Sequence, residues 1–312
     1  MAGYTTLESS ADLDALRQAL GADRINLWGI SYGTHLALAA LKVMEPRIDR
    51  LVLASVEGLD QTVKLPARTD RYFERLQLAI DADPAAKARY PDLVALVRRV
   101  LSRLAESPVR VEAPAESGNP MTVVMGPDEV RLLSGFAISD PEGAAMLLRL
   151  YRDADLGDWA PLAQYVARFA RRPIQVAGMP EVMDAASGIG AERLALVRRQ
   201  AETSLLGDVL NFPIPHLVDA FGPVDLGDEF RSPPRSSRPA LVLSGTLDGR
   251  TYPESHREAV AGLSRMTFVT VERAGHNLFM VAPAVGDLIA RFLRGEPVAD
   301  TTITIPLADF RS

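Results

Sequence analysis

The sequence contains no cysteine, no long apolar run and no block of charge of one sign. The lack of cysteine excludes disulfides, thiolate metal sites and a cysteine nucleophile. No stretch of 18 apolar residues is present, so we expect no membrane-spanning helix and no membrane partner. The 34 basic and 40 acidic residues are mixed along the chain and give a net charge of −6. A chain without a basic block is not expected to bind nucleic acid.

Several familiar motifs are also missing. The first thirty residues lack the basic start, apolar centre and small-residue cleavage site of a signal peptide, so we expect a cytoplasmic protein. There is no Walker loop, no Gly-x-Gly-x-x-Gly and no His-Glu-x-x-His. Nucleotide and zinc chemistry therefore have no support, and we expect neither a cofactor nor a metal.

Helix and strand patterns alternate over the first 55 residues. Leu13, Leu16 and Leu20 recur at helical spacing and predict a helix that Ser10 can cap. A short apolar run over 25–28 predicts a strand, a second helix runs to about residue 44, and 48–54 reads as another strand. Such alternation is typical of a parallel sheet covered by helices, and thus of an α/β fold.

The pattern then becomes mainly helical, for example over 93–104, 128–152 and 191–206. A proline-rich stretch over 232–239 ends this region, because it can form neither a central strand nor a helix. Strands over 240–244 and 266–272 and a closing helix after Pro283 follow. We therefore expect a core made of residues 1–57 and 238–312, interrupted by a mainly helical cap over 58–237.

The segment Gly29-Ile30-Ser31-Tyr32-Gly33 matches Gly-x-Ser-x-Gly, the motif of a nucleophile elbow. In this turn a strand passes sharply into a helix and the serine hydroxyl stands above the sheet edge. The string is short enough to occur by chance, but its place between a predicted strand and a predicted helix favours a catalytic Ser31. The alternative is an ordinary glycine-rich turn in which Ser31 caps the helix.

A serine nucleophile needs a base, and the sequence has four histidines. His276 follows a predicted strand, where a loop can carry its imidazole over the carboxyl edge of the sheet. We expect structural roles for the others: His35 packs along the elbow helix, His216 lies between proline-bounded segments, and His256 lies on an exposed helix.

A catalytic histidine needs a carboxylate partner. Asp248 stands at the carboxyl end of a predicted strand, in Ser244-Gly245-Thr246-Leu247-Asp248, and the order Ser, Asp, His agrees with this kind of fold. A turn aspartate before glycine is the alternative interpretation. Glu57 and Asp60, just after the strand over 48–54, can be substitute orienting acids, anchors for a substrate ammonium group, or solvated loop carboxylates.

Four stretches together resemble the proline iminopeptidase and tripeptidyl aminopeptidase-like branch of the α/β-hydrolases. They are residues 4–12, 28–34, 241–248 and 274–277, and the resemblance spans almost the entire chain. It implies hydrolysis of an ester or peptide bond through an acyl-enzyme, under a helical cap. By residue, Ser31 matches the nucleophile, Asp248 the acid, His276 the base, and Tyr32 the position whose backbone N–H helps hold the oxyanion.

One departure from that family concerns the start of the fold. Family members place several strands, and a loop that donates a second oxyanion N–H, before the elbow; here about 24 residues precede the elbow strand. Four strands can be counted, against a usual five or six. We therefore expect the strand over 25–28 to be an exposed sheet edge that allows homo-oligomers, or a longer upstream segment to be required.

The sequence thus predicts a serine hydrolase acting on a small-molecule ester or a short peptide with a free N-terminus. A protein that uses the same fold for binding without turnover is the alternative.

Overall fold

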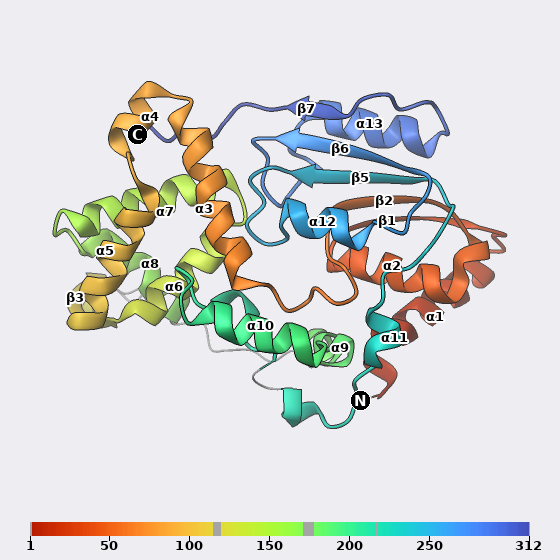
Figure 1. Ribbon diagram of the computed structural model, residues 1–312, viewed down its shortest axis with the longest axis horizontal. Coiled ribbons are helices and arrows are strands. Elements are labelled where there is room, and N and C mark those ends of the chain that lie inside the picture. The colour runs from red at the N-terminus through yellow and green to blue at the C-terminus, as the bar shows by residue number, and fades with distance from the viewer. Residues whose placement is uncertain (1, 115–119, 171–177, 216–217, 312) are drawn as a thin grey trace. The chain divides into compact units, whose positions relative to one another are not determined.

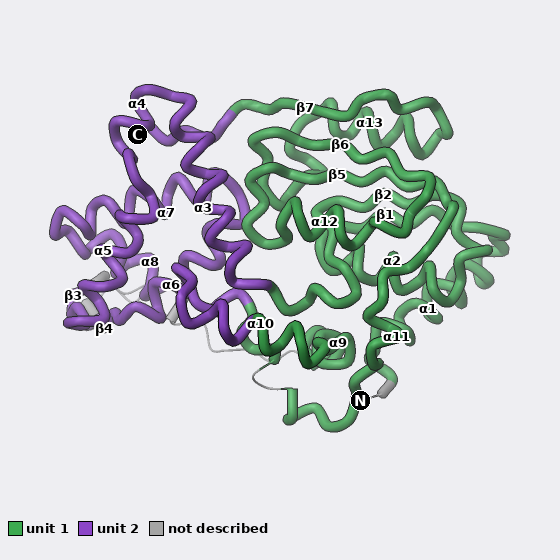
Figure 2. The backbone as a smooth tube through the Cα atoms, viewed as in Figure 1, with its two compact units in different colours: residues 1–64, 177–196, 211–306 green, residues 65–176, 197–210, 307–312 purple. Residues whose placement is uncertain are grey.

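The computed structural model describes residues 2–114, 120–170, 178–215 and 218–311, and His216 falls outside them (Figure 1). The chain forms two compact units (Figure 2). Unit 1 contains residues 1–64, 177–196 and 211–306, and unit 2 contains residues 65–176, 197–210 and 307–312. The assignment of residues 58–237 as a cap stays a prediction. No helix within the described ranges is long and apolar enough to cross a bilayer.

Unit 1 is built on a sheet of five parallel strands in the order β1-β2-β5-β6-β7. The strands are β1 (Ile25–Ser31), β2 (Ile48–Val56), β5 (Ala240–Gly245), β6 (Met266–Glu272) and β7 (Thr302–Thr304). The four strands predicted from the sequence are therefore confirmed. The fifth, β7, was missed because three mostly exposed residues carry no apolar run.

Helices complete the unit. They are α1 (Thr6–Ala19), α2 (Tyr32–Met44), α9 (Met179–Ser187), α11 (Gly227–Arg231), α12 (Pro253–Ala259) and α13 (Pro283–Leu293), while α10 (Ala191–Ala201) runs across the boundary between the units. The predicted cap of the first helix was wrong: Thr5 caps α1 by accepting from the Glu8 N–H. Ser10 lies inside the helix, where its buried hydroxyl donates to the Thr6 carbonyl.

The alternation of side chains along β2 divides the core between the two faces of the sheet. Leu51 and Leu53 pack with the apolar face of α2, whereas Val52 and Ala54 pack with that of α13. Burial of one such side chain stabilises the fold by roughly 1.5–3 kcal/mol. Because strands buried on both faces must read as continuous apolar runs, this core explains the sequence of β2 and β5.

Strand β1 forms one edge of the described sheet. Its Trp28 side chain is 56% exposed and meets the ring of Phe279 edge-on, with ring centroids 4.8 Å apart. The edge position agrees with the expectation from the sequence. Self-association through this edge stays a prediction.

Unit 2 is mainly helical. Its elements are α3 (Pro66–Asp81), α4 (Pro84–Arg89), α5 (Leu93–Glu106), α6 (Pro127–Ala137), α7 (Pro141–Asp155), α8 (Ala160–Ala170) and an antiparallel hairpin of β3 (Val109–Pro114) and β4 (Pro120–Met125). Pro141 begins α7, so the continuous helical pattern over 128–152 is in fact two helices. The hairpin was not predicted.

Candidate active site

The segment around Ser31 has the geometry of a nucleophile elbow. Ser31 ends β1 at φ 54° and ψ −126°, a conformation that is costly for any residue with a side chain, and α2 begins at the next residue. Ser31 makes no side-chain capping hydrogen bond to α2. Its hydroxyl is thus not used as a helix cap, which removes the main structural explanation for a serine at this position.

The two glycines of the motif differ in what they do. A Cβ atom at Gly29 would lie 2.4 Å from the Gly33 carbonyl oxygen, whereas a Cβ at Gly33 would have no heavy atom within 4 Å. The crowded turn therefore requires glycine at position 29 and only tolerates it at position 33.

Asp248 and His276 come together at the carboxyl edge of the same parallel sheet, Asp248 in the turn after β5 and His276 in the loop after β6. Close approach of these segments depends on Gly245, because a Cβ there would lie 2.3 Å from the Gly275 carbonyl oxygen. The Leu247 N–H also donates to the Ala274 carbonyl at 2.8 Å.

The two side chains are hydrogen-bonded. His276 Nδ1 lies 3.0 Å from Asp248 Oδ2 and 3.2 Å from Oδ1. Because an ionised carboxylate can only accept, Nδ1 carries the proton, and Nε2 of a neutral ring has a lone pair that can act as a base. From β2, the Ser55 hydroxyl donates to the His276 carbonyl at 2.7 Å and fixes the loop backbone.

Asp248 is fully buried, yet it is kept ionised. Burial alone would raise its pKa, but its interactions with His276 and His256 and the hydrogen bond from the Arg250 N–H together lower the pKa below the ordinary value. The Arg250 and Thr251 N–H groups donate to Oδ1, both at 2.8 Å. A permanent anion at this place suits a group that orients a histidine and stabilises its charged form.

The structure pairs Asp248 with His276 but does not join Ser31 to them. In the part of the chain that is described, no hydrogen bond links the Ser31 hydroxyl to His276. Tyr32 is the first residue of α2, so its N–H is one of the helix's unpaired donors, and its phenol is hydrogen-bonded to Thr6 Oγ1 at 2.5 Å. The catalytic roles of these residues remain proposals.

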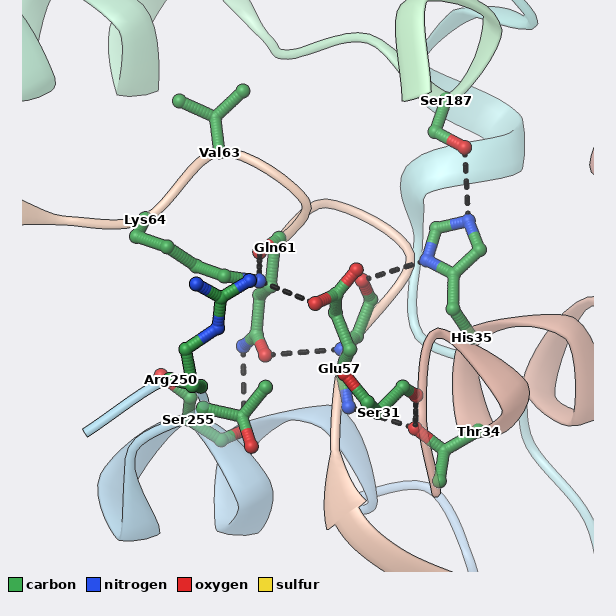
Figure 3. A network of polar contacts seen from close by, with 12 residues as sticks. Ser31, Thr34, His35, Glu57, Gln61, Val63, Lys64, Ser187, Arg250 and Ser255 are labelled. Carbon is green, nitrogen blue, oxygen red and sulfur yellow. Dashed lines mark hydrogen bonds and ion pairs between the residues drawn. The ribbon is translucent and has the colours of Figure 1, made fainter. Parts of the chain in front are cut away.

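Glu57 lies beside the elbow, because Ser31 pairs with Val56 across the β1–β2 ladder. The Thr34 hydroxyl joins the two strand ends, donating to the Ser31 carbonyl at 2.6 Å and accepting from the Glu57 N–H at 2.8 Å (Figure 3). The Glu57 carboxylate is buried and forms an ion pair with Lys64. The interpretation as a solvated loop carboxylate is therefore wrong for Glu57.

A second carboxylate, Asp184 on α9, lies near Glu57 and was not predicted. Burial and the charge of Glu57 raise its pKa from 3.8 to about 7, against the opposing effect of Lys64. Asp60, in contrast, has a 41% exposed side chain and lies 4.0 Å from Arg193. Sequence offered no signal for Asp184, because it lies 127 residues beyond Glu57 and α9 carries no motif.

The remaining described histidines are buried. His35 lies on α2, as expected, with Nδ1 donating to the Gly58 carbonyl at 3.1 Å and Nε2 2.9 Å from Ser187 Oγ (Figure 3). His256 lies on α12, but its predicted exposure was wrong: the side chain is 0% exposed and is hydrogen-bonded to Ser244 and Thr251.

Two family models match the chain. The model described as alpha/beta hydrolase fold matches residues 2–104, which include the elbow. The model described as TAP-like protein matches residues 222–302, which include Asp248 and His276. These two matches confirm the predicted α/β-hydrolase fold.

The chain is also similar to tripeptidyl aminopeptidases. Those of Streptomyces lividans and Streptomyces coelicolor are each 27% identical over 199 residues, which cover 60% of this chain and 32% of the relative. The match thus spans about a third of the length of these relatives.

Among solved structures, an epoxide hydrolase from an endophytic Streptomyces has 17% identity and a TM-score of 0.43, covering 97% of this chain and 78% of the other. A proline iminopeptidase-related protein from Thermus thermophilus has 18% identity and a TM-score of 0.39, with 94% and 71% covered. Structural similarities with TM-scores below 0.5 add nothing to the matches with the family models.

Proposed function

We propose that this α/β-hydrolase is a serine hydrolase that cleaves an ester or amide bond through an acyl-enzyme on Ser31. The observation that carries the proposal is the buried Asp248–His276 hydrogen bond at the sheet edge where the strained Ser31 also ends its strand. In this proposal His276 Nε2 removes the serine proton as the hydroxyl oxygen attacks the carbonyl carbon.

The later steps use the same groups. The Tyr32 N–H donates to the oxyanion of the tetrahedral intermediate, and the proton on His276 passes to the leaving alcohol or amine as the carbonyl re-forms. Water then attacks the acyl-enzyme with His276 again as base, which releases the acid and restores Ser31. Asp248 holds the imidazole and stabilises its charged form throughout.

The test is the substitution Ser31→Ala, assayed with p-nitrophenyl butyrate. We expect hydrolysis and labelling by a fluorophosphonate to be lost with an unchanged circular dichroism spectrum, because one hydroxyl without a capping bond adds little to folding. Ser134→Ala, which removes a buried hydroxyl from unit 2, is the matched control and should keep full activity. A wild-type chain that neither reacts with the probe nor turns over would favour a binding protein without catalysis.

A specific observation favours substrates with a free amino group. Near the elbow, Glu57 forms an ion pair with Lys64, and an ionised Asp184 adds a second negative charge close to that of Glu57. We infer that this charge, with Glu57, holds the ammonium group of a short peptide. Asp60, the other candidate from the sequence, lies 4.0 Å from Arg193.

This second inference has its own assay. Asp184→Asn should raise the KM for an aminoacyl p-nitroanilide with a free amine, and should leave the KM for its N-acetylated form and for p-nitrophenyl butyrate unchanged. Equal effects on the free and the acetylated substrate would count against an ammonium site.

A further inference from the structure

A second histidine is buried next to the proposed catalytic acid. His256 and Asp248 are both 0% exposed, and His256 Nε2 lies 3.8 Å from Asp248 Oδ2. Thr251 lies between them: its hydroxyl oxygen is 2.9 Å from Asp248 Oδ2 and 3.0 Å from His256 Nε2. On the other side of the ring, Ser244 Oγ is 2.8 Å from His256 Nδ1.

The direction of each hydrogen bond follows from the chemistry of the partners. An ionised Asp248 can only accept, so the Thr251 hydroxyl gives it its single proton. That hydroxyl must then accept from His256, which places a proton on Nε2. In a neutral His256 the Nδ1 atom is an acceptor, and the Ser244 hydroxyl donates to it. The chain of donors therefore runs from Ser244 through His256 and Thr251 to Asp248.

Packing alone does not explain these residues. A polar ring buried without partners costs free energy, and an apolar side chain of similar size would fill the same volume without that cost. Here both ring nitrogens of His256 are hydrogen-bonded to hydroxyls, and the series of hydrogen bonds ends on the carboxylate that accepts from His276. The Thr251 hydroxyl also lies 3.3 Å from His276 Nδ1, where it limits the positions open to that ring.

We propose that His256 and Thr251 are positioning residues for the Asp248–His276 pair, and this inference rests on the proposed serine hydrolase function. Thr251 holds Oδ2 in line with His276 Nδ1, and His256 fixes the Thr251 hydroxyl so that its proton points at the carboxylate. By donating to Asp248, the chain of hydrogen bonds also stabilises the ionised carboxylate and lowers its basicity.

The test uses the full chain with Thr251→Val, which keeps the shape of the side chain and removes the hydroxyl. We expect kcat for p-nitrophenyl butyrate to fall about 10- to 100-fold, the range for a lost hydrogen bond to a charged group, with KM unchanged. The acid limb of the kcat/KM profile should move to higher pH, since Asp248 becomes more basic. Thr251→Ser should restore most of the rate, and His256→Gln, which retains an N–H donor, should be less damaging than His256→Leu.

Two further measurements separate this inference from the proposed function. Histidine ¹⁵N NMR reports the tautomer without turnover: we expect His256 protonated at Nε2, and a change at His256 and His276 in Thr251→Val. If Thr251→Val does not fold, Ser244→Ala tests the far end of the chain by the same spectra and profile. Wild-type kinetics and pH profile in folded Thr251→Val or His256→Leu would overturn the inference, as would an Nδ1-protonated His256. The activity of Ser31→Ala tests the proposed function and does not test the positioning role of His256 and Thr251.

Discussion

Replacement of Asp184 by asparagine should stabilise the protein at alkaline pH and have little effect in acid. Asparagine has nearly the shape of a protonated aspartic acid but cannot ionise. In the folded protein the pKa of Asp184 is raised from 3.8 to about 7, first by burial and then by the charge of Glu57. The folded state therefore binds the proton of Asp184 more tightly than the unfolded chain does.

This difference sets the sign and size of the effect. A raised carboxyl pKa costs stability as pH rises, beginning near the unfolded value of 3.8 and reaching its full extent near pH 7. Three pKa units correspond to about 4 kcal/mol at roughly 1.4 kcal/mol per unit. Asp184 is partly exposed, and solvent screening reduces the effect to about 2 kcal/mol.

Urea unfolding of wild type and Asp184→Asn at pH 4 and pH 8 measures this directly. We expect equal unfolding free energies at pH 4 and a variant more stable by about 2 kcal/mol at pH 8. Asp287→Asn, at an exposed position of α13 in the same unit, is the control and should change neither value. An Asp184→Asn variant less stable than wild type at pH 8 would refute the reasoning, because it would mean that the carboxylate is stabilised in the folded protein.

Two further predictions concern substitutions at Asp248 and at the glycines of the elbow. Asp248→Asn should lower kcat for p-nitrophenyl butyrate by up to about 10⁴-fold, since an amide does not hold His276 in the required tautomer, whereas Glu57→Gln should do far less. The reverse order would show that Glu57 is the acid. Gly29→Ala should sharply lower the melting temperature or prevent folding, because its Cβ would lie 2.4 Å from the Gly33 carbonyl oxygen, while Gly33→Ala should be tolerated. Equal melting temperatures of the two alanine variants would contradict this account.

The parts of the fold that were predicted are those with a local signal. Apolar runs mark β2 and β5, which are buried on both faces, and the elbow motif stands at a strand–helix junction where a turn with positive φ is needed. Asp248 and His276 were identified because each follows such a strand, and parallel strands bring their carboxyl ends to one edge. By contrast, β7 has only three residues, and its place in the sheet depends on pairing with β6, which lies much earlier in the chain.

The sequence contains no comparable signal for whether a charged side chain is buried or paired. Glu57 and Asp60 are three residues apart and read alike, yet Glu57 is buried against Lys64 while Asp60 is partly exposed near Arg193. His256 reads as a surface residue because charged residues flank it, but the ring is buried against Thr251 and Ser244. In each case a contact formed in the folded protein determines which partner the side chain has, and that partner determines the chemical role that the side chain can take. Because Asp248 is hydrogen-bonded to His276 whereas Glu57 is paired with Lys64, we propose Asp248 rather than Glu57 as the orienting acid.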